Sequence, residues 1–354
     1  MTTADSTGKP AESPKRRFSR LRLPRRGRPL IRRRWLRWTV RVLVALFVLG
    51  TLFSLVYNLA TNGDQKPASA LYPGPYVQID GRAVAYRELG RQGSPIILLG
   101  GFAEPSWVWK QVGQRLALGH RVYALDLPPF GYSERKGPYS LAGWTKLVRD
   151  FSTHFGLRRP IIVGHSLGAA VAVDVGLEAP ANTGGVVLLD GDALPVGGPH
   201  WLANLVLNPY YTTLFRLVTH SDWLVRKVLV QAYGPDRPPI TGSQVDAFER
   251  PFRVDGTENG FHDLFRGGVQ GLTLADLKRL RVPRIVVWGQ RDAVDNLKAG
   301  RTSAQALGVK LIVIPRAGHL SMLSEPALVA RAIGSFAARV ERAPKVSAVK
   351  KRKR

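Results

Sequence analysis

Residues 161–172 read Ile-Ile-Val-Gly-His-Ser-Leu-Gly-Ala-Ala-Val-Ala and decide the fold. The β-branched run 161–163 is typical of a buried strand, and the small-residue run 169–172 is typical of the start of a helix. Between them, Gly164 to Gly168 matches G-x-S-x-G in the context that this pattern requires, a strand, a tight turn and a helix. The two glycines let the backbone double back and expose the Ser166 hydroxyl, toward which the amides of the following helix point. The stretch predicts a serine nucleophile, and a glycine-rich turn that merely contains a serine is the alternative.

A serine nucleophile needs a histidine as base and a carboxylate that orients the histidine. Of the seven histidines, His319 follows the last expected strand, at the sheet edge where open α/β folds bind ligands. Asp292 follows the preceding strand. The order Ser166, Asp292, His319 therefore matches the order nucleophile, acid, base that accompanies a G-x-S-x-G turn between a strand and a helix. Three other acids near strand ends remain alternatives for the acid: Asp295, Asp190 and Asp192.

Short apolar runs alternate with helical stretches along most of the chain. Continuous apolar runs are typical of strands buried in a parallel sheet, and the alternation predicts right-handed crossovers with helices on both faces. We therefore expect an α/β fold with a mostly parallel sheet of eight strands. Helices are expected at 107–118, at 141–155 and from the turn around Ser166 onward to about 177, with 169–172 near the start. The expected strands are residues 76–79, 83–88, 95–99, 121–125, 161–163, 185–189, 284–288 and 310–314.

The interval 193–275 interrupts this alternation. It is rich in aromatic residues, contains no buried strand run, and is too long for a loop in a compact domain. We expect a helical cap inserted between two strands, above the site. Some of its aromatic side chains are expected to line an apolar pocket, although packing within the cap must account for most of them.

The charge of the chain is concentrated at its two ends. The net charge is +27, and residues 1–41 contain 14 Lys and Arg against Asp5 and Glu12, while residues 345–354 contain six more. Because these tails lack a folded or aromatic-interleaved nucleic-acid reader, we expect contact with anionic lipid and no nucleic-acid partner. The chain has no cysteine, which excludes disulfides and thiolate sites. No His, Asp or Glu cluster has ligand spacing, so neither a metal nor another cofactor is expected.

Residues 42–60 form a stretch of 19 residues without a charge. As a helix it would be roughly 28 Å long, close to the thickness of a bilayer's hydrocarbon core. Trp35 and Trp38 near one end, and Tyr57 near the other, suit the two membrane interfaces. The preceding arginines predict a single-pass anchor in the cell membrane, with a cytoplasmic N-terminus and the remaining chain outside. A cleaved signal peptide, including a twin-arginine variant at Arg33-Arg34, and a buried core helix are the alternatives.

These observations divide the chain into seven expected parts, in order along the sequence. They are a disordered basic cytoplasmic tail (1–38), a transmembrane helix (39–60), a linker (61–75), the first part of the α/β core (76–192), the cap (193–275), the second part of the core (276–341) and a disordered basic tail (342–354).

Residues 76–341 resemble the α/β-hydrolase family, in particular its capped esterase and lipase-like branch. The resemblance rests on five motifs, at 100–107, 126–133, 164–168, 289–292 and 317–319. It implies that Ser166 is the nucleophile, Asp292 the acid and His319 the base. It also implies an oxyanion hole formed by the backbone amides of Leu167 and Phe102.

One position departs from the family pattern: Gly100-Gly101 stands where the family usually has His-Gly. Because the donor in the oxyanion hole is a backbone amide, Gly100 does not by itself remove it. We expect an active enzyme that hydrolyses apolar carboxylic esters, including acyl lipids, through an acyl-enzyme on Ser166. Cofactor-free haloperoxidase chemistry, carbon–carbon bond hydrolysis and a catalytically inactive binding or scaffold protein are the alternatives.

Overall fold

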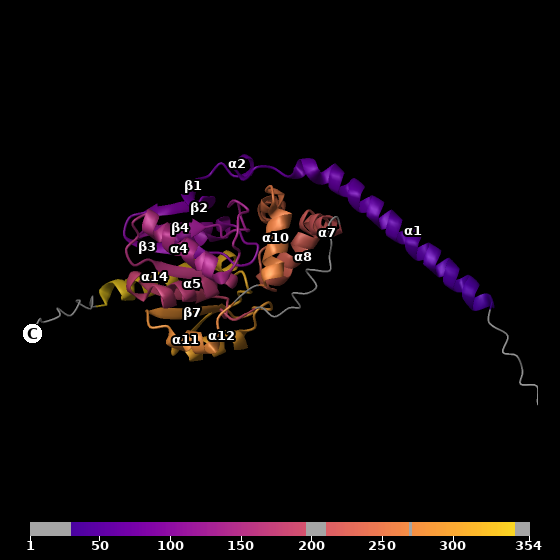
Figure 1. The fold of residues 1–354 in the computed structure, drawn as a ribbon. Helices are drawn as coiled ribbons and strands as arrows, with labels where there is room; N and C mark the ends of the chain where they lie inside the picture. The colour runs from indigo at the N-terminus through magenta and orange to yellow at the C-terminus, as the bar shows by residue number, and fades with distance from the viewer. Residues whose placement is uncertain (1–29, 196–209, 269–270, 344–354) are drawn as a thin grey trace, which may run out of the picture. The chain divides into compact units, whose positions relative to one another are not determined.

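The structure is a computed structural model that describes residues 30–195, 210–268 and 271–343 (Figure 1). The chain divides into two compact units between Gly50 and Thr51. Most of the expected N-terminal tail, and the C-terminal tail after residue 343, lie outside the described residues.

An eight-stranded sheet forms the centre of the second unit, in the order β1-β2-β4-β3-β5-β6-β7-β8. β1 pairs antiparallel with β2, β2 pairs antiparallel with β4, and every other pairing is parallel. This confirms the mostly parallel eight-stranded sheet that the apolar runs predicted. The strands are Tyr76–Ile79 (β1), Arg82–Arg91 (β2), Ser94–Leu99 (β3), His120–Leu125 (β4), Ile161–His165 (β5), Gly185–Leu189 (β6), Arg284–Gly289 (β7) and Leu311–Ile314 (β8).

Helices cover both faces of the sheet because alternate strand residues face opposite sides. In β3, Ile97 and Leu99 belong to the core shared with α4 (Leu141–His154), α5 (Leu167–Glu178) and α12 (Leu297–Leu307). Ile96 and Leu98 belong to the opposite core, shared with α3 (Lys110–Leu116) and α14 (Pro326–Arg342). The expected helix at 107–118 is instead a 3-10 turn, Ser106–Trp109, followed by α3.

The chain between β6 and β7 is helical where the structure describes it. It forms α7 (Tyr210–Thr219), α8 (Asp222–Tyr233), α9 (Gly242–Glu249) and α10 (Thr257–Gly267), and α11 (Leu274–Arg279) then leads back to the sheet. Figure 1 shows α7, α8 and α10 as a group of helices beside the sheet. Part of the interval expected to be a cap, residues 196–209, lies outside the described residues.

The N-terminal helix is longer than the sequence predicted. α1 runs from Leu30 to Thr61, so residues 30–38, expected to be disordered, are helical. Leu, Arg and Trp between 30 and 38 are compatible with a helix, so the disorder expected from the composition of residues 1–38 was wrong for this part. Within the described residues, one helical stretch, Arg34–Asp64, is long and apolar enough to cross a membrane.

The segment expected to be a plain linker, 61–75, also contains regular structure. Asn62–Asp64 forms a 3-10 turn and Ala68–Leu71 forms α2. Between them, Lys66 makes a parallel bridge with Val254, the residue after the short 3-10 helix Arg250–Arg253. This segment is therefore held against the helical region that precedes α10.

Candidate active site

Ser166 lies at the end of β5, in the turn that leads directly into α5. Its backbone has φ 50° and ψ −120°, a left-handed conformation that is unfavourable for a side chain larger than glycine. The turn closes because its neighbours lack a Cβ. A Cβ on Gly164 would lie 2.0 Å from the Gly168 carbonyl oxygen, and one on Gly191 would lie 2.4 Å from the Ser166 carbonyl oxygen. The packed glycines hold Ser166 in this conformation at the carboxyl edge of the sheet.

His319 and Asp292 are brought together by two loops at the same edge. His319 Nδ1 lies 2.8 Å from Asp292 Oδ2, and both side chains are almost completely buried. The other carboxylate oxygen of Asp292 accepts hydrogen bonds from the amides of Val294 and Asp295, each at 2.9 Å. Asp292 is thus fixed on one side by its own loop and directs its free oxygen at the imidazole.

The other acids that the sequence left open have different partners. Asp295 contributes its amide to Asp292 and its carbonyl to the indole of Trp288. Asp192 accepts a hydrogen bond from the amide of Leu194. Asp190 accepts one from the amide of Gly289 at 2.6 Å and one from the Ser321 hydroxyl. Among the described residues, Asp292 is the acid that hydrogen-bonds the His319 ring.

His165, the residue before Ser166, connects the loop of His319 to the loop after β3. Its Nε2 donates to the His319 carbonyl oxygen at 2.8 Å, and its Nδ1 lies 2.8 Å from Glu104 Oε2. A carbonyl oxygen and a carboxylate are both acceptors, so both ring nitrogens must carry a proton. His165 is therefore an imidazolium, and its ring centroid lies 4.8 Å from that of His319. The described residues include no hydrogen bond between the Ser166 hydroxyl and His319.

The charges around His165 explain its protonation. Burial alone would lower the pKa of His165, but the Glu104 carboxylate and Asp190, 3.9 Å away, raise this pKa to about 9. Burial would likewise raise the pKa of Glu104, but His165 and the amide of Gly101 hold it below its usual value. Burial raises the pKa of Asp190 to about 6, against the opposing effect of the two histidines.

Glu104 also shapes the loop expected to contain the oxyanion hole. Its Oε2 accepts the amide of Gly101 at 2.7 Å. This loop passes so close to the turn at Ser166 that a Cβ on Gly101 would lie 2.8 Å from the Ser166 Cβ. A Cβ on Gly100 would lie 3.1 Å from the Glu104 Cβ, so the space beside residue 100 is filled by Glu104. The missing imidazole at position 100 is thus accompanied by a buried carboxylate four residues later.

Phe102 places an aromatic ring between the core and the helical insertion. The ring is 41% exposed, and its centroid lies 5.3 Å from that of Phe130 in the core. The same ring contacts Phe261 and Phe265 of α10, with centroids 5.6 and 5.9 Å away. The surroundings of the Phe102 ring are therefore apolar and partly supplied by α10.

Sequence reasoning did not find Glu104, and it gave His165 no role. The signal was present, because Glu104 is an acid in an otherwise apolar loop directly after a buried strand. No pattern in the sequence, however, relates Glu104 to residue 165. Their contact depends on β3 and β5 lying side by side in the sheet.

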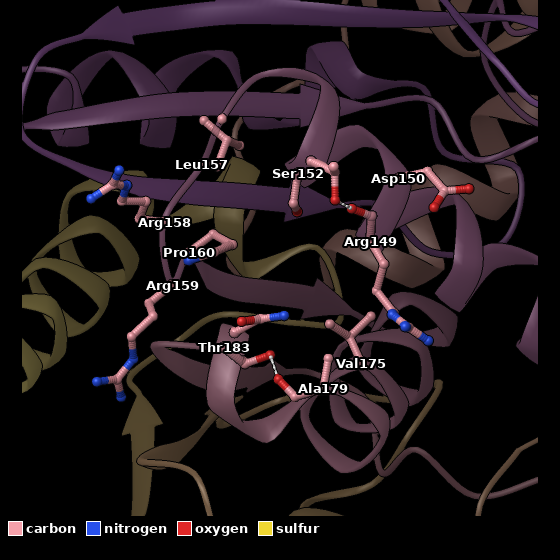
Figure 2. A pocket seen from close by; sticks show the side chains of 13 residues that line it. Arg149, Asp150, Ser152, Leu157, Arg158, Arg159, Pro160, Val175, Ala179 and Thr183 are labelled. Carbon is pink, nitrogen blue, oxygen red and sulfur yellow. Dashed lines mark hydrogen bonds between the residues drawn. The ribbon is translucent and has the colours of Figure 1, made fainter. Parts of the chain in front are cut away.

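A cavity of about 550 Å³ lies at the other end of β5, around Pro160 and Val175. Because β5 has five residues, this cavity is roughly 16 Å along the strand from Ser166. Figure 2 shows the guanidinium groups of Arg158 and Arg159 extending to one side and that of Arg149 to the other. These cations do not converge on a common point, and the cavity is separate from the candidate active site.

The comparisons with known proteins agree with the fold. Residues 96–332 match the model of the alpha/beta hydrolase family, so the chain belongs to that family. The hydrolase YugF of Bacillus subtilis is 25% identical over 255 residues, 71% of this chain and 92% of that protein. The pimeloyl-[acyl-carrier protein] methyl ester esterase of Pectobacterium carotovorum is 26% identical over 254 residues, 70% of this chain and 96% of that protein. A solved membrane phospholipase A superposes with a TM-score of 0.62 at 21% identity, covering 88% of this chain and all of its own.

Glu104→Gln is expected to lower stability in a pH-dependent manner. The folded pKa of His165, about 9, lies above its unfolded value of 6.5, so this contribution is complete below pH 6.5 and is lost as the pH rises through 9. Glu104 contributes above its unfolded pKa of 4.5 and loses this contribution as the pH falls. The deficit in unfolding free energy should be largest between about pH 5 and 6.5 and smaller above about pH 9.

Denaturant unfolding of the full chain in detergent, repeated across this pH range, measures the deficit. Asp255→Asn, at an exposed aspartate, is the control, and an equal deficit at every pH would contradict the charged pair.

Proposed function

We propose that this member of the family is a membrane-anchored serine hydrolase that cleaves carboxylic esters through an acyl-enzyme on Ser166. The observation that carries the proposal is the 2.8 Å contact between His319 and Asp292. The main chain of His319 is hydrogen-bonded to His165, the residue before Ser166. A strained serine, a histidine and a buried carboxylate at one sheet edge are the parts that acyl transfer requires.

In the proposed reaction the Ser166 hydroxyl attacks the ester carbonyl carbon while His319 Nε2 accepts its proton. Asp292 keeps Nδ1 protonated and stabilises the imidazolium that forms. The amides of Leu167 and Phe102 bind the oxyanion of the tetrahedral intermediate, and His319 returns the proton to the leaving alcohol. Water, deprotonated by the same imidazole, then attacks the acyl-enzyme and releases the acid and free Ser166.

An apolar acyl group is the proposed substrate feature. The rings of Phe102, Phe261 and Phe265 provide an apolar surface next to the proposed oxyanion loop. The similarity to an esterase and to a membrane phospholipase A is consistent with ester substrates, including acyl lipids. Turnover of p-nitrophenyl esters of increasing chain length would define the preferred acyl group.

Labelling by a fluorophosphonate probe tests the nucleophile. The wild-type chain should be labelled, because an activated serine attacks phosphorus as it attacks a carbonyl. Ser166→Ala should lose the label, whereas Ser152→Ala, on α4 and away from the site, should retain it. Equal labelling of wild type and Ser166→Ala would exclude Ser166 as the nucleophile and favour an inactive binding protein.

The acid is tested by comparing two neighbouring aspartates. Asp292→Asn should lower kcat by about 10⁴, because an amide in place of the carboxylate favours the wrong tautomer of the base. Asp295→Asn should have a small effect, since the contact of Asp295 with the triad is through its main-chain amide. A larger loss of kcat in Asp295→Asn than in Asp292→Asn would transfer the acid role to Asp295.

The proposed topology places the N-terminus in the cytoplasm and the hydrolase domain outside, because arginines gather on the N-terminal side of the apolar stretch. Protease added to intact cells that carry an N-terminal tag should remove residues 76–341 and leave the tagged anchor in the membrane. Digestion of the domain only after lysis would contradict this topology and place the domain on the cytoplasmic side.

A further inference from the structure

The outer part of α1, its C-terminal end from residue 51 to residue 61, packs against α7 through polar side chains. Thr51, Ser54, Asn58 and Thr61 recur at intervals of three and four residues and therefore share one face of the helix. The Thr213 hydroxyl of α7 lies 2.9 Å from Ser54 Oγ and 3.0 Å from Asn58 Oδ1, within hydrogen-bond distance of both. The hydroxyls of Thr51 and Tyr210 lie 2.6 Å apart.

Arg216 completes this polar contact. Its Nη1 donates to the Asn58 carbonyl at 2.9 Å and to the Thr61 hydroxyl at 2.8 Å, and its Nε donates to Glu258 of α10 at 2.7 Å. The Arg216 and Glu258 side chains are only 6% and 10% exposed. The cation and its counter-ion are thus both enclosed between helices.

The outward surfaces of the same two helices are apolar. On α7, Leu214, Leu217 and Val218 are 57%, 41% and 45% exposed, whereas Thr213, Arg216 and Thr219 are buried. We name Leu214, Leu217 and Val218 the α7 apolar face. On the outer part of α1, Ser54 is buried while the apolar side chains around it are exposed, namely Leu52, Phe53, Leu55, Val56 and Leu59.

This distribution is the reverse of that expected for helices in water. A helix at an aqueous surface buries its apolar stripe and exposes its polar one. Helices in hydrocarbon lack that driving force, are held together by polar contacts, and turn apolar side chains toward the lipid. Ionisable groups inside a membrane also face the protein and pair with one another, as Arg216 does with Glu258.

The position of the contact along α1 sets its depth. α7 contacts α1 between residues 51 and 61, that is, along the outer half of the uncharged stretch 42–60 and at the residue after it. If that stretch spans the hydrocarbon core, a helix packed along its outer half lies in the outer leaflet. On α8, the exposed Trp223 with Lys227 Nζ 4.0 Å above its ring is a pair typical of the membrane interface.

From these contacts we infer that the α7 apolar face is immersed in the outer leaflet of the bilayer, beside the end of α1. The inference rests on the membrane anchor of the proposed function and adds that the helical insertion itself contacts acyl chains. Phe215 of α7 lies 5.3 Å from Phe261, which in turn contacts Phe102. One layer of aromatic rings therefore separates the lipid-facing helix from the proposed oxyanion loop.

Single-cysteine fluorescence tests the inference directly, because the chain has no cysteine of its own. Leu214→Cys and Val218→Cys are labelled with an environment-sensitive dye in the full chain, reconstituted in phosphatidylethanolamine–phosphatidylglycerol vesicles. Leu46→Cys reports on α1 itself, and Leu118→Cys, at a side chain 91% exposed between α3 and β4, is the aqueous control. The melting temperature of each variant establishes that it is folded, and hydrolysis of a soluble ester is measured separately.

The probes at 214 and 218 should have blue-shifted emission and be quenched by nitroxide lipid as strongly as the probe at 46. The probe at 118 should be quenched by aqueous iodide instead. Iodide quenching at 214 and 218 together with lipid quenching at 46 would overturn the inference and leave the anchor intact. Loss of lipid quenching at residue 46 as well would contradict the membrane anchor. This outcome does not depend on whether the chain hydrolyses the soluble ester. Shielding at 214 and 218 could instead require high protein density and be insensitive to nitroxide lipid. That result would make the α7 apolar face a contact between two copies of the chain, and it would also overturn the inference.

Discussion

The candidate site depends on one buried charge, the imidazolium of His165. Its two N–H groups hold the Glu104 carboxylate on one side and the main chain of His319 on the other. Through Glu104 this charge also reaches the amide of Gly101, so one ring connects the loop after β3, the turn at Ser166 and the loop after β8. Three loops far apart in sequence are positioned by a group that need not contact a substrate. A buried ion pair of this kind is a weak source of net stability, but removal of one partner leaves the other charge unsolvated. The arrangement therefore tolerates little variation.

Much of the fold was predictable because local rules and tertiary structure agree. The runs 185–189 and 285–288 are apolar on both faces, which is typical of a central parallel strand, and both lie in strands. The turn around Ser166 was predictable for the same reason, since glycine at 164 and 168 has a steric cause that is visible in the sequence. The pairing of Asp292 with His319 followed from chain order, which places both after neighbouring strands.

What could not be predicted depends on contacts between distant segments. Glu104 and His165 are 61 residues apart. The helix at 30–38 was expected to be disordered because residues 1–38 as a whole are rich in Arg, Pro, Ser and Thr. The polar face at 51, 54, 58 and 61 was hidden within a stretch that is apolar on average. The role of this face depends on α7, which packs against it. In each case the sequence contains the residues but not the neighbour that gives them a role.

The backbone at Ser166 has a consequence for how this protein can change. A non-glycine residue at φ 50° and ψ −120° carries strain on the order of 1–3 kcal/mol, which the surrounding packed glycines impose. Glycine at 166 would relieve that strain, so the most stable version of this fold is one that has lost its hydroxyl. Under the proposed function, stability and activity are therefore opposed at this position, and selection for stability alone would favour an inactive descendant.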